Sequence, residues 1–568
     1  KTSDRDALRL LFAADSHWRN ICGITWSFAT ISGDAAIADA LLARVAEAEA
    51  CGFKLFVDRH PPRLNTVAEE EVIEAVLQFR TKAGTGIGVV RFKHAGAEAS
   101  GRPIAWSLMT AIEQLDGHNY TPIQDEEDQN HNRSSETGNW LDRRAQERSY
   151  DNKEPDVLIV GGGHAGLTSA VELKQLGLDA LVVDGMKRVG DNWRLPYHSL
   201  KLHNVTSVNH LPYMPFPPTW PNYIPKDMLG LWFEFYAQVM EINHWTSTEF
   251  TKGEWDADEK CWVATLKMED GSARVMRPRH IVFANGVSSF PLKPEIPGLD
   301  RLKGDVIHSE GFDSGAPYAG KKAIVIGTGS SANDIALDLH SFGCDTTLVQ
   351  RGSSTVVSIE PSAKLNYALY DEGPSIEDCD ILASAITPPL LIQGYQAAVK
   401  RMLELDKDMI NGLKGIGFKF DVGEDGTGHQ MKYRRKGGGY NLDAGSSELM
   451  IKGEIGLLQN DRIERYCEEG ALLKDGTIVP ADVVVTATGY YPQGELVRRS
   501  LGEDMASRIG QVWGQDEDGE LSNMFKRTPQ DGVWFIAGSL TQARIYSKYM
   551  ALQIKAIEEG LVDVNPYE

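Results

Sequence analysis

Short runs of apolar residues, each followed by glycines and then by an amphipathic stretch, occur twice in the chain. The first run is Val157–Val160 and the second is Ala323–Ile326. A continuous apolar run that ends in glycine is typical of a strand buried on both faces of a parallel sheet, and the amphipathic stretch predicts a helix after it. The pattern therefore predicts two βαβ units of the same design, the only internal repeat that we find in the sequence.

The first 122 residues have a different pattern. The expected elements are two helices, at 6–13 and 35–50, and three strands, at 72–81, 87–92 and 104–112. Alternating strands separated by tight turns predict an antiparallel meander, and helices packed on such a sheet resemble the NTF2-like or SnoaL-like cone. Asp15, His17 and Trp18 fit ordinary positions of such a unit. We therefore expect a structural or interface role for it.

Polar composition marks the next boundary. Residues 123–153 are rich in Asp, Glu, Asn, Arg and Ser, so they lack the apolar surface for a core and are expected to be a linker. The predicted fold class is α/β, with two Rossmann-type dinucleotide-binding domains after an α+β NTF2-like domain. The expected domains are 1–122 for the NTF2-like unit, 154–300 with 466–568 for the FAD-binding domain, and 301–465 for the NAD(P)-binding domain with a helical insertion.

Composition narrows the possible partners. The formal net charge of −22 argues against nucleic acid and anionic membranes, because an acidic surface repels both. The six cysteines show no metal-ligand or redox-pair spacing, so we expect no metal and a reducing, cytoplasmic location. No apolar run reaches the about 18 residues of a membrane span. Residues 1–20 are too charged for a signal peptide, although a removed targeting segment stays possible because the sequence begins with Lys. A small-molecule substrate and a possible homodimer are expected.

The first glycine-rich loop reads G-x-G-x-x-G directly after the strand at 157–160. Gly161 permits the tight turn, Gly163 lets the backbone approach a pyrophosphate, and Gly166 lets helix and strand pack closely. A second strand then ends in Asp184, near the interval expected for a carboxylate that holds a ribose. Together these features predict a dinucleotide site and disfavour a simple glycine-rich surface turn.

The residues that follow indicate which dinucleotide binds. Arg188, Asn192 and Trp193 belong to a run similar to the G-x-W segment of flavin-dependent monooxygenases, where it lies along the flavin. Trp193 alone would equally suit core packing. In this order the run favours FAD at the first site.

The second loop repeats the pattern with Gly327, Gly329, Ser330 and Ser331, and with alanine in place of the third glycine. Its second strand ends in Arg351 where the first site has an acid. The guanidinium fork suits a 2′-phosphate, so we expect NADPH, with NADH possibly accepted. A solvated surface charge is the alternative interpretation of Arg351.

Between and after the two loops lie three further segments. Gly304 and His308 belong to a segment that resembles the F-x-G-x-x-x-H fingerprint of flavin-containing and Baeyer–Villiger monooxygenases, with Leu302 in place of the aromatic. We expect His308 to be a hinge or positioning residue. Thr488 and Gly489 end an apolar strand in an Ala-Thr-Gly turn that carries the chain between domains. Gly538 ends another, before a helix expected beyond Tyr546 that directs its N-terminus at the flavin.

Taken together, the motifs from Val157 onward resemble class B flavoprotein monooxygenases, and most closely the type II flavin-containing monooxygenases. The resemblance implies that NADPH reduces FAD, that the reduced flavin and O2 form a C4a-(hydro)peroxyflavin, and that one oxygen atom is inserted into a small or cyclic ketone to give an ester or lactone. It also implies catalytic roles for His203, beside the flavin, and for its neighbour Asn204.

Three alternatives remain at this point. Oxygenation of a soft sulfur or nitrogen atom uses the same machinery, and an indole-pyruvate-type decarboxylating monooxygenase shares the motifs but is not expected to carry the N-terminal unit. A disulfide reductase needs a cysteine pair soon after the first helix, and no cysteine lies between Gly166 and Cys261. The sequence therefore favours oxygen insertion.

Overall fold

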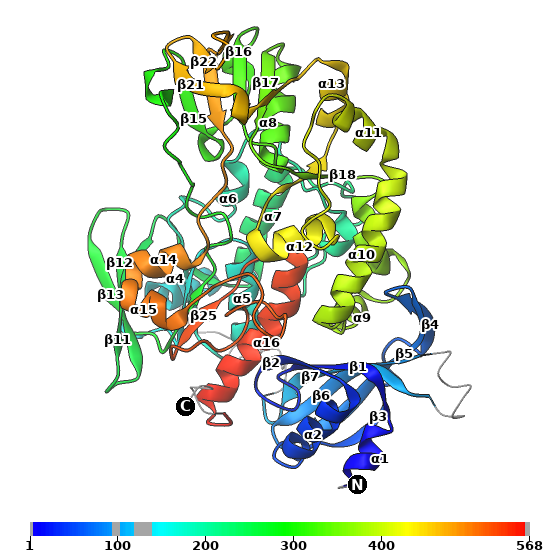
Figure 1. Ribbon diagram of the computed structural model, residues 1–568. Coiled ribbons are helices and arrows are strands. Elements are labelled where there is room, and N and C mark those ends of the chain that lie inside the picture. The colour runs from blue at the N-terminus through cyan, green and yellow to red at the C-terminus, as the bar shows by residue number, and fades with distance from the viewer. Residues whose placement is uncertain (1–3, 94–102, 119–138, 563–568) are drawn as a thin grey trace.

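The computed structural model describes residues 4–93, 103–118 and 139–562. Three units meet around one long C-terminal helix, α16 (Leu540–Glu558). In Figure 1 the N-terminal sheet lies at the bottom, the second dinucleotide domain lies at the top, and the first dinucleotide domain lies between them. None of the helices in the described part of the chain is both long and apolar enough to cross a bilayer.

The N-terminal unit is a seven-stranded sheet with two helices, α1 (Arg5–Arg9) and α2 (Asp34–Val45). The expected meander is present, since β5, β6 and β7 pair antiparallel in sequence order. Its strands are β1 (Phe12–Ile21), β2 (Phe28–Ser32), β3 (Cys51–Leu55), β4 (Arg63–Val67), β5 (Glu70–Thr81), β6 (Gly84–Lys93) and β7 (Ala105–Leu115), in the order β2-β1-β7-β6-β5-β3 with β4 also on β5. The helices are shorter than predicted, because Phe12 and Ala13 already belong to β1.

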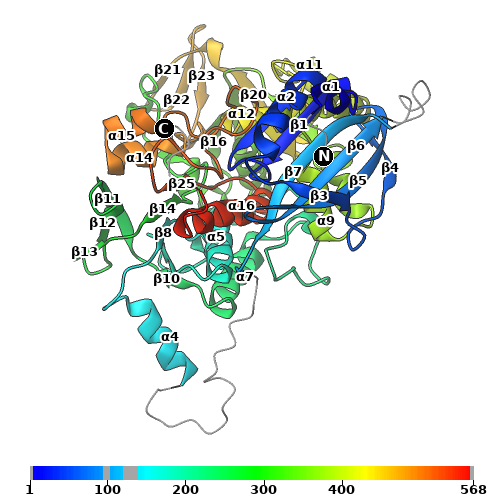
Figure 2. The same cartoon turned by 90° about the horizontal axis from the view of Figure 1, so that it is seen from below.

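This sheet packs on the rest of the molecule through both charge and apolar surface. Arg19 donates two hydrogen bonds to the Glu520 carboxylate, at 2.7 and 2.6 Å, and both side chains are buried. Phe28 lies against Tyr546 and Tyr549 of α16, with ring centroids 6.0 and 6.5 Å apart. Figure 2 shows the sheet beside α16, with α9 behind its strands. The N-terminal unit is therefore part of one continuous buried core.

The expected linker is partly helical. Residues 123–138 lie outside the described residues, and α4 (Trp140–Ser149) follows them, opened by a capping box between Asn139 and Asp142. Arg144 donates to the Glu241 carbonyl at 2.7 Å, and α4 is thereby held beside β10.

The first dinucleotide domain is a five-stranded parallel sheet in the order β10-β9-β8-β14-β25. The predicted strands at 157–160 and 180–183 are present with those bounds. The strands are β8 (Val157–Val160), β9 (Ala180–Val183), β10 (Asn243–Trp245), β14 (His280–Phe283) and β25 (Val533–Phe535), with helices α5 (His164–Gln175), α6 (Asp191–Arg194) and α7 (Lys226–Val239). An antiparallel sheet of β11 (Glu249–Asp256), β12 (Cys261–Lys267) and β13 (Ala273–Met276) lies beside α14 (Gly494–Leu501) and α15 (Glu503–Ile509).

The second dinucleotide domain has the sheet order β15-β24-β16-β17-β20, all parallel. Its strands are β15 (Asp305–His308), β16 (Lys322–Ile326), β17 (Asp345–Gln350), β20 (Gly456–Gln459) and β24 (Val483–Thr486), with α8 (Ser330–Ser341) and α13 (Ser446–Lys452) packed on them. A small antiparallel sheet holds β21 (Ile463–Cys467), β22 (Gly470–Leu473) and β23 (Ile478–Pro480).

The expected domain boundary at residue 466 is wrong. β24 lies between β15 and β16 in the second sheet, so the chain returns to the first domain only after Thr486. Four consecutive buried residues suit the centre of either parallel sheet, and the apolar pattern alone does not say which sheet accepts them.

A helical insertion leaves the second domain after β18 (Thr355–Ser358) and returns at β19 (Tyr440–Asp443). Its elements are η6 (Ala363–Asp371), α9 (Ile376–Ser384), α10 (Pro388–Leu405), α11 (Lys407–Gly415) and α12 (Gly428–Lys436). In Figure 1 α10 and α9 run down from the second domain toward the N-terminal sheet. The insertion thus bridges the two ends of the molecule.

Two connections join the dinucleotide domains, and they pair with each other. The outgoing segment follows β14 and the returning segment follows β24, with an antiparallel bridge between Pro291 and Tyr490. The Leu292 N–H donates to the Gly489 carbonyl at 2.9 Å, and the Thr488 hydroxyl donates to the Leu292 carbonyl at 2.6 Å. The domains are therefore joined by a two-stranded hinge.

Candidate active site

The first glycine loop has the geometry of a phosphate-binding turn. Gly161 has a φ of +114°, and a Cβ there would lie 2.6 Å from the Ala284 carbonyl oxygen, so another residue is excluded. Gly166 packs directly on the Gly161 carbonyl. Gly163 caps α5 without a side-chain cap, which leaves the first backbone N–H groups of the helix for an anion.

The remaining first-site residues gather around this loop. The Asp184 carboxylate accepts hydrogen bonds from the N–H groups of Gly162 and Met186. A small cavity beside it is lined by Asp184, Arg188 and Asn192, and Arg188 also pairs with Glu234 at 2.8 Å. Trp193 is partly buried against the core, as the packing interpretation would have it. The loop and the carboxylate fit the adenosine and pyrophosphate half of FAD.

The second loop matches the first in geometry. Gly327 has a φ of +133°, with the Ala487 carbonyl oxygen 2.6 Å from a Cβ placed there, and Gly329 caps α8 without a side-chain cap. Ser331 is exposed beside this cap. The Ser330 hydroxyl accepts the Leu442 N–H at 3.2 Å, so it also fastens β19 to the loop.

Arg351 is exposed immediately after β17, and within the described ranges no carboxylate forms an ion pair with it. The preceding Gln350 is fully buried and binds the backbone of Lys419 in both directions, at 3.0 and 2.8 Å. The end of β17 is therefore held in place, and the Arg351 guanidinium is accessible to a phosphate group. Together with the second loop, this arrangement fits NADP.

The fingerprint segment lies at the hinge. A Cβ at Gly304 would collide with the Asp482 carbonyl, so the glycine lets β15 approach the start of β24. His308 is buried, its Nδ1 accepts the Glu310 N–H at 3.2 Å, and its ring stands edge-on to Tyr490 of the returning connection, 5.6 Å between centroids. Burial lowers the pKa of His308, which favours the neutral ring. These contacts agree with a positioning residue.

The C-terminal helix begins earlier than the sequence suggested. α16 starts at Leu540, with a capping box between Ser539 and Gln542, so Tyr546 lies inside the helix. Gly538, with a φ of +114°, places its carbonyl 2.9 Å from the His164 ring nitrogen of the first loop. The amino end of α16 therefore lies beside the first dinucleotide site.

His203 and Asn204 diverge although they are adjacent in sequence. His203 lies 3.4 Å from the Asp334 carboxylate of α8, in a cavity between the two dinucleotide domains that Lys201 and Tyr223 also line. Asn204 lines a different cavity. The structure does not bring the two proposed catalytic residues into one site.

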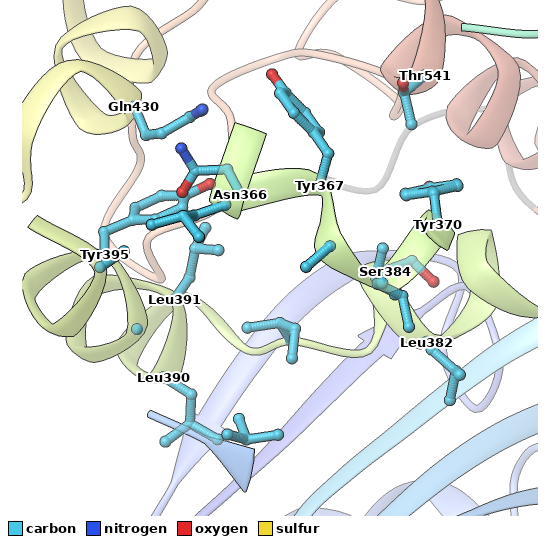
Figure 3. A pocket seen from close by; sticks show the side chains of 18 of the residues that line it. Asn366, Tyr367, Tyr370, Leu382, Ser384, Leu390, Leu391, Tyr395, Gln430 and Thr541 are labelled. Atoms are coloured by element: carbon cyan, nitrogen blue, oxygen red, sulfur yellow. The ribbon is translucent and has the colours of Figure 1, made fainter. Parts of the chain in front are cut away.

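The cavity that Asn204 enters has a volume of about 600 Å³ and lies where the three units meet. Ser539 and Thr541 contribute the amino end of α16, and η6, α10 and α12 contribute the helical insertion. Figure 3 shows Asn366 and Tyr367 of η6 across from Tyr395 and Leu391 of α10, with strands of the N-terminal sheet below. We call residues 199–204 the flavin loop, because the family resemblance implies that they lie along the flavin. Asn204 of this loop and the amino end of α16 make this the candidate substrate cavity.

The N-terminal sheet supplies part of the wall. The Arg91 guanidinium pairs with Glu74 at 2.6 Å and donates to the carbonyls of Leu382 and Ala385, both at 2.9 Å. Arg63 also pairs with Glu74, at 3.1 Å. The N-terminal unit therefore forms an interface and also lines the candidate substrate cavity. The sequence carried a faint signal, since these charges stand within strand patterns that otherwise alternate.

The side chains of the cavity are neutral donors and acceptors for the most part. Burial raises the pKa values of Tyr433 and Tyr440, so both phenols keep their protons at neutral pH. Burial lowers the pKa of His429 to about 4, so its imidazole is uncharged. Burial is also the main cause of the raised pKa of Tyr367, whose hydroxyl meets the side chains of Asn204 and Gln430.

A family model described as pyridine nucleotide-disulphide oxidoreductase matches residues 155–371, which include both glycine loops. The indole-3-pyruvate monooxygenase YUCCA1 of Oryza sativa subsp. japonica is 27% identical over 351 residues, which are 62% of this chain and 80% of that protein.

Solved structures share the architecture. The cyclohexanone monooxygenase from Rhodococcus sp. Phi1 bound to NADP+ has a TM-score of 0.52 at 18% identity, covering 71% of this chain and 85% of that one. An oxidized steroid monooxygenase bound to NADP has the same score and identity, over 72% and 85%. At these identities the matches show the fold.

The fold, the two loops and these similarities define the class of protein. The chain is a flavin-dependent monooxygenase, an oxidoreductase with FAD and NADP as its cofactors. More narrowly, it resembles the class B flavin monooxygenases.

Proposed function

We propose that this enzyme inserts one oxygen atom beside the carbonyl group of a ketone, the Baeyer–Villiger reaction, as type II flavin-containing monooxygenases do. The balanced reaction consumes the ketone, O2, NADPH and a proton, and yields an ester or lactone, NADP+ and water. The observation that carries the proposal is the 600 Å³ cavity, which combines Asn204 of the flavin loop, the amino end of α16 and a wall of protonated phenols.

The hydrogen-bond donors of this cavity suit a substrate with a carbonyl group. When a nucleophile adds to a ketone, negative charge develops on the carbonyl oxygen, and fixed hydrogen-bond donors in a dry site stabilise that charge. The phenols of Tyr367 and Tyr433 and the amide of Gln430 are donors of this kind. A sulfide or amine develops no such charge on an oxygen of its own before transfer, so it gains less from them.

The chain's own residues hold the reactants and exclude water. Reduced FAD, when bound, supplies the activation of O2. Asp184 and the first loop hold its adenosine half, and Arg351 with the second loop holds NADP. Leu390, Leu391 and the N-terminal sheet line the cavity, and their apolar surface disfavours water beside the reacting atoms. We retain the proposals that the N-terminal unit is NTF2-like and that His203 positions groups near the flavin.

A decarboxylating oxygenation of a 2-oxo acid is the second candidate. The similarity to an indole-3-pyruvate monooxygenase favours it. It also begins with attack on a carbonyl carbon, so the same donors would serve it.

Product analysis with paired substrates tests the proposal. FAD-loaded enzyme is given NADPH and 18O2 with cyclobutanone, with phenylpyruvate or with methyl phenyl sulfide, and matched reactions without NADPH are the controls. We expect labelled lactone from the ketone and little sulfoxide. Sulfoxide as the main labelled product would overturn carbonyl oxygenation, and labelled phenylacetate alone would select the second candidate.

A further inference from the structure

The candidate substrate cavity contains one guanidinium without a counter-charge. Arg434 of α12 lines this cavity, and among the residues that the structure describes no Asp or Glu forms an ion pair with it. Its hydrogen-bond partner is the Tyr395 side chain of α10. Arg434 is half-buried, and its guanidinium stays charged at any working pH, so part of this charge is removed from water without a counter-ion. A negatively charged group of a ligand would therefore be stabilised at this guanidinium.

The other arginines around the cavity are neutralised. Arg63 and Arg91 face Glu74 and Glu372, two cations against two anions. The nearby Arg19 is matched by Glu520 at 2.6 Å, and it adds to the positive field at Arg434. The surplus positive charge of this wall therefore resides on Arg434.

Arg435, the next residue of α12, forms an ion pair within the chain and serves as a comparison for Arg434. Arg435 pairs with Asp425 at 2.7 Å and with the Gln515 side chain at 3.1 Å, and it faces a different cavity. The two adjacent arginines thus differ in the cavity that they face and in their ion pairing. Arg435 has its carboxylate within the chain, and Arg434 does not.

The residues around Arg434 indicate the shape and polarity of the rest of the ligand. Tyr395, Tyr433 and Tyr546 surround the guanidinium side of the cavity, and Leu390 and Leu391 continue the apolar surface. Aromatic and aliphatic walls of this kind bind a flat apolar body. A single fixed cation at one side binds a single carboxylate, in the bidentate geometry that arginine favours.

We propose that Arg434 binds a carboxylate of the substrate, and that the molecule oxygenated by this enzyme is an organic anion with an apolar or aromatic body. This inference rests on the proposed function in one respect, namely that the oxygenated molecule occupies this cavity. The recognition itself is a property of the cavity and is measured without turnover.

Equilibrium binding to the FAD-loaded enzyme tests the recognition. The probes are 4-oxo-4-phenylbutanoate and its uncharged methyl ester, titrated by calorimetry in the absence of NADPH. We expect the wild type to bind the carboxylate about ten- to a hundredfold more tightly than the ester, which is the range for a charge-assisted hydrogen bond. R434Q abolishes the preference, R434K retains part of it, and R435Q leaves it intact.

The outcomes separate this inference from the proposed function. Equal affinity of the wild type for both probes, or an undiminished preference in R434Q, overturns the role of Arg434 even if the ketone is oxygenated. Arg434-dependent binding without oxygenation of either probe, of cyclobutanone or of phenylpyruvate supports the anion site and overturns the carbonyl reaction. A lower thermal midpoint of R434Q than of R435Q would assign the residue a structural role, because loss of an unpaired charge should not destabilise the fold.

Discussion

A buried carboxylate of the first dinucleotide domain makes the stability of this enzyme depend on pH. Glu172 of α5 is buried, and its Oε2 accepts the Tyr213 hydroxyl at 2.8 Å. Burial raises the pKa of this carboxyl to about 7 from 4.5, against the opposing effect of the Tyr213 hydrogen bond. The folded protein therefore holds a proton on Glu172 that the unfolded chain releases at lower pH.

The direction of the effect follows from which state binds more protons. Between pH 4.5 and 7 the folded state binds more protons than the unfolded state, so stability is complete below pH 4.5 and falls as the pH rises. A shift of about 2.5 units at about 1.36 kcal/mol per unit amounts to about 3 kcal/mol once the pH exceeds 7. Ionisation of one buried group thus weakens the fold by a sizeable share of a domain's stability.

The variant Glu172→Gln removes this titration and keeps an oxygen for the Tyr213 hydroxyl. We expect the variant to gain about 3 kcal/mol over the wild type at pH 8 and under 1 kcal/mol at pH 5. Urea unfolding at the two pH values, followed by tryptophan fluorescence, measures the difference. Tyr213→Phe is the opposite control, since loss of the donor should steepen the decline with pH. An equal pH dependence in wild type and Glu172→Gln would refute the reasoning.

Three further predictions concern the cofactors. Asp184→Asn should weaken FAD retention about ten- to a hundredfold, measured by flavin fluorescence after dilution, because a carboxylate hydrogen bond to the ribose is lost. Arg351→Gln should raise the KM for NADPH about tenfold and leave that for NADH, and an equal rise for both would contradict a phosphate contact. His203→Ala should keep FAD and consume NADPH but release hydrogen peroxide in place of product, and unchanged coupling would remove His203 from the mechanism.

Local signals made the dinucleotide sites predictable. A glycine is required at the end of each strand, because Gly161 and Gly327 have positive φ. A Cβ at either position would also collide with the carbonyl oxygen of Ala284 or Ala487. The expected loops, their helices and the carboxylate at Asp184 are all where the spacing placed them. Such features depend on residues within about 25 positions of one another.

Contacts over long separations were not predictable. β24 is as apolar as a strand of either sheet, and its partner is decided by the path of the whole chain. The candidate substrate cavity joins Arg91, Asn204, Arg434 and Thr541, which no motif relates. The sequence predicts a common task for His203 and Asn204, yet the two residues lie in a bend and line different cavities.

The paired connections between the dinucleotide domains link the backbones of the two cofactor loops. Two antiparallel segments held by hydrogen bonds resist sliding and separation but tolerate bending, so a rotation of one domain against the other would bend the chain near Pro291 and Tyr490. Each segment begins beside the glycine of one loop, at Ala284 for Gly161 and at Ala487 for Gly327. A rotation therefore displaces both phosphate-binding turns at once, and the two cofactors are mechanically coupled by the backbone that links their domains.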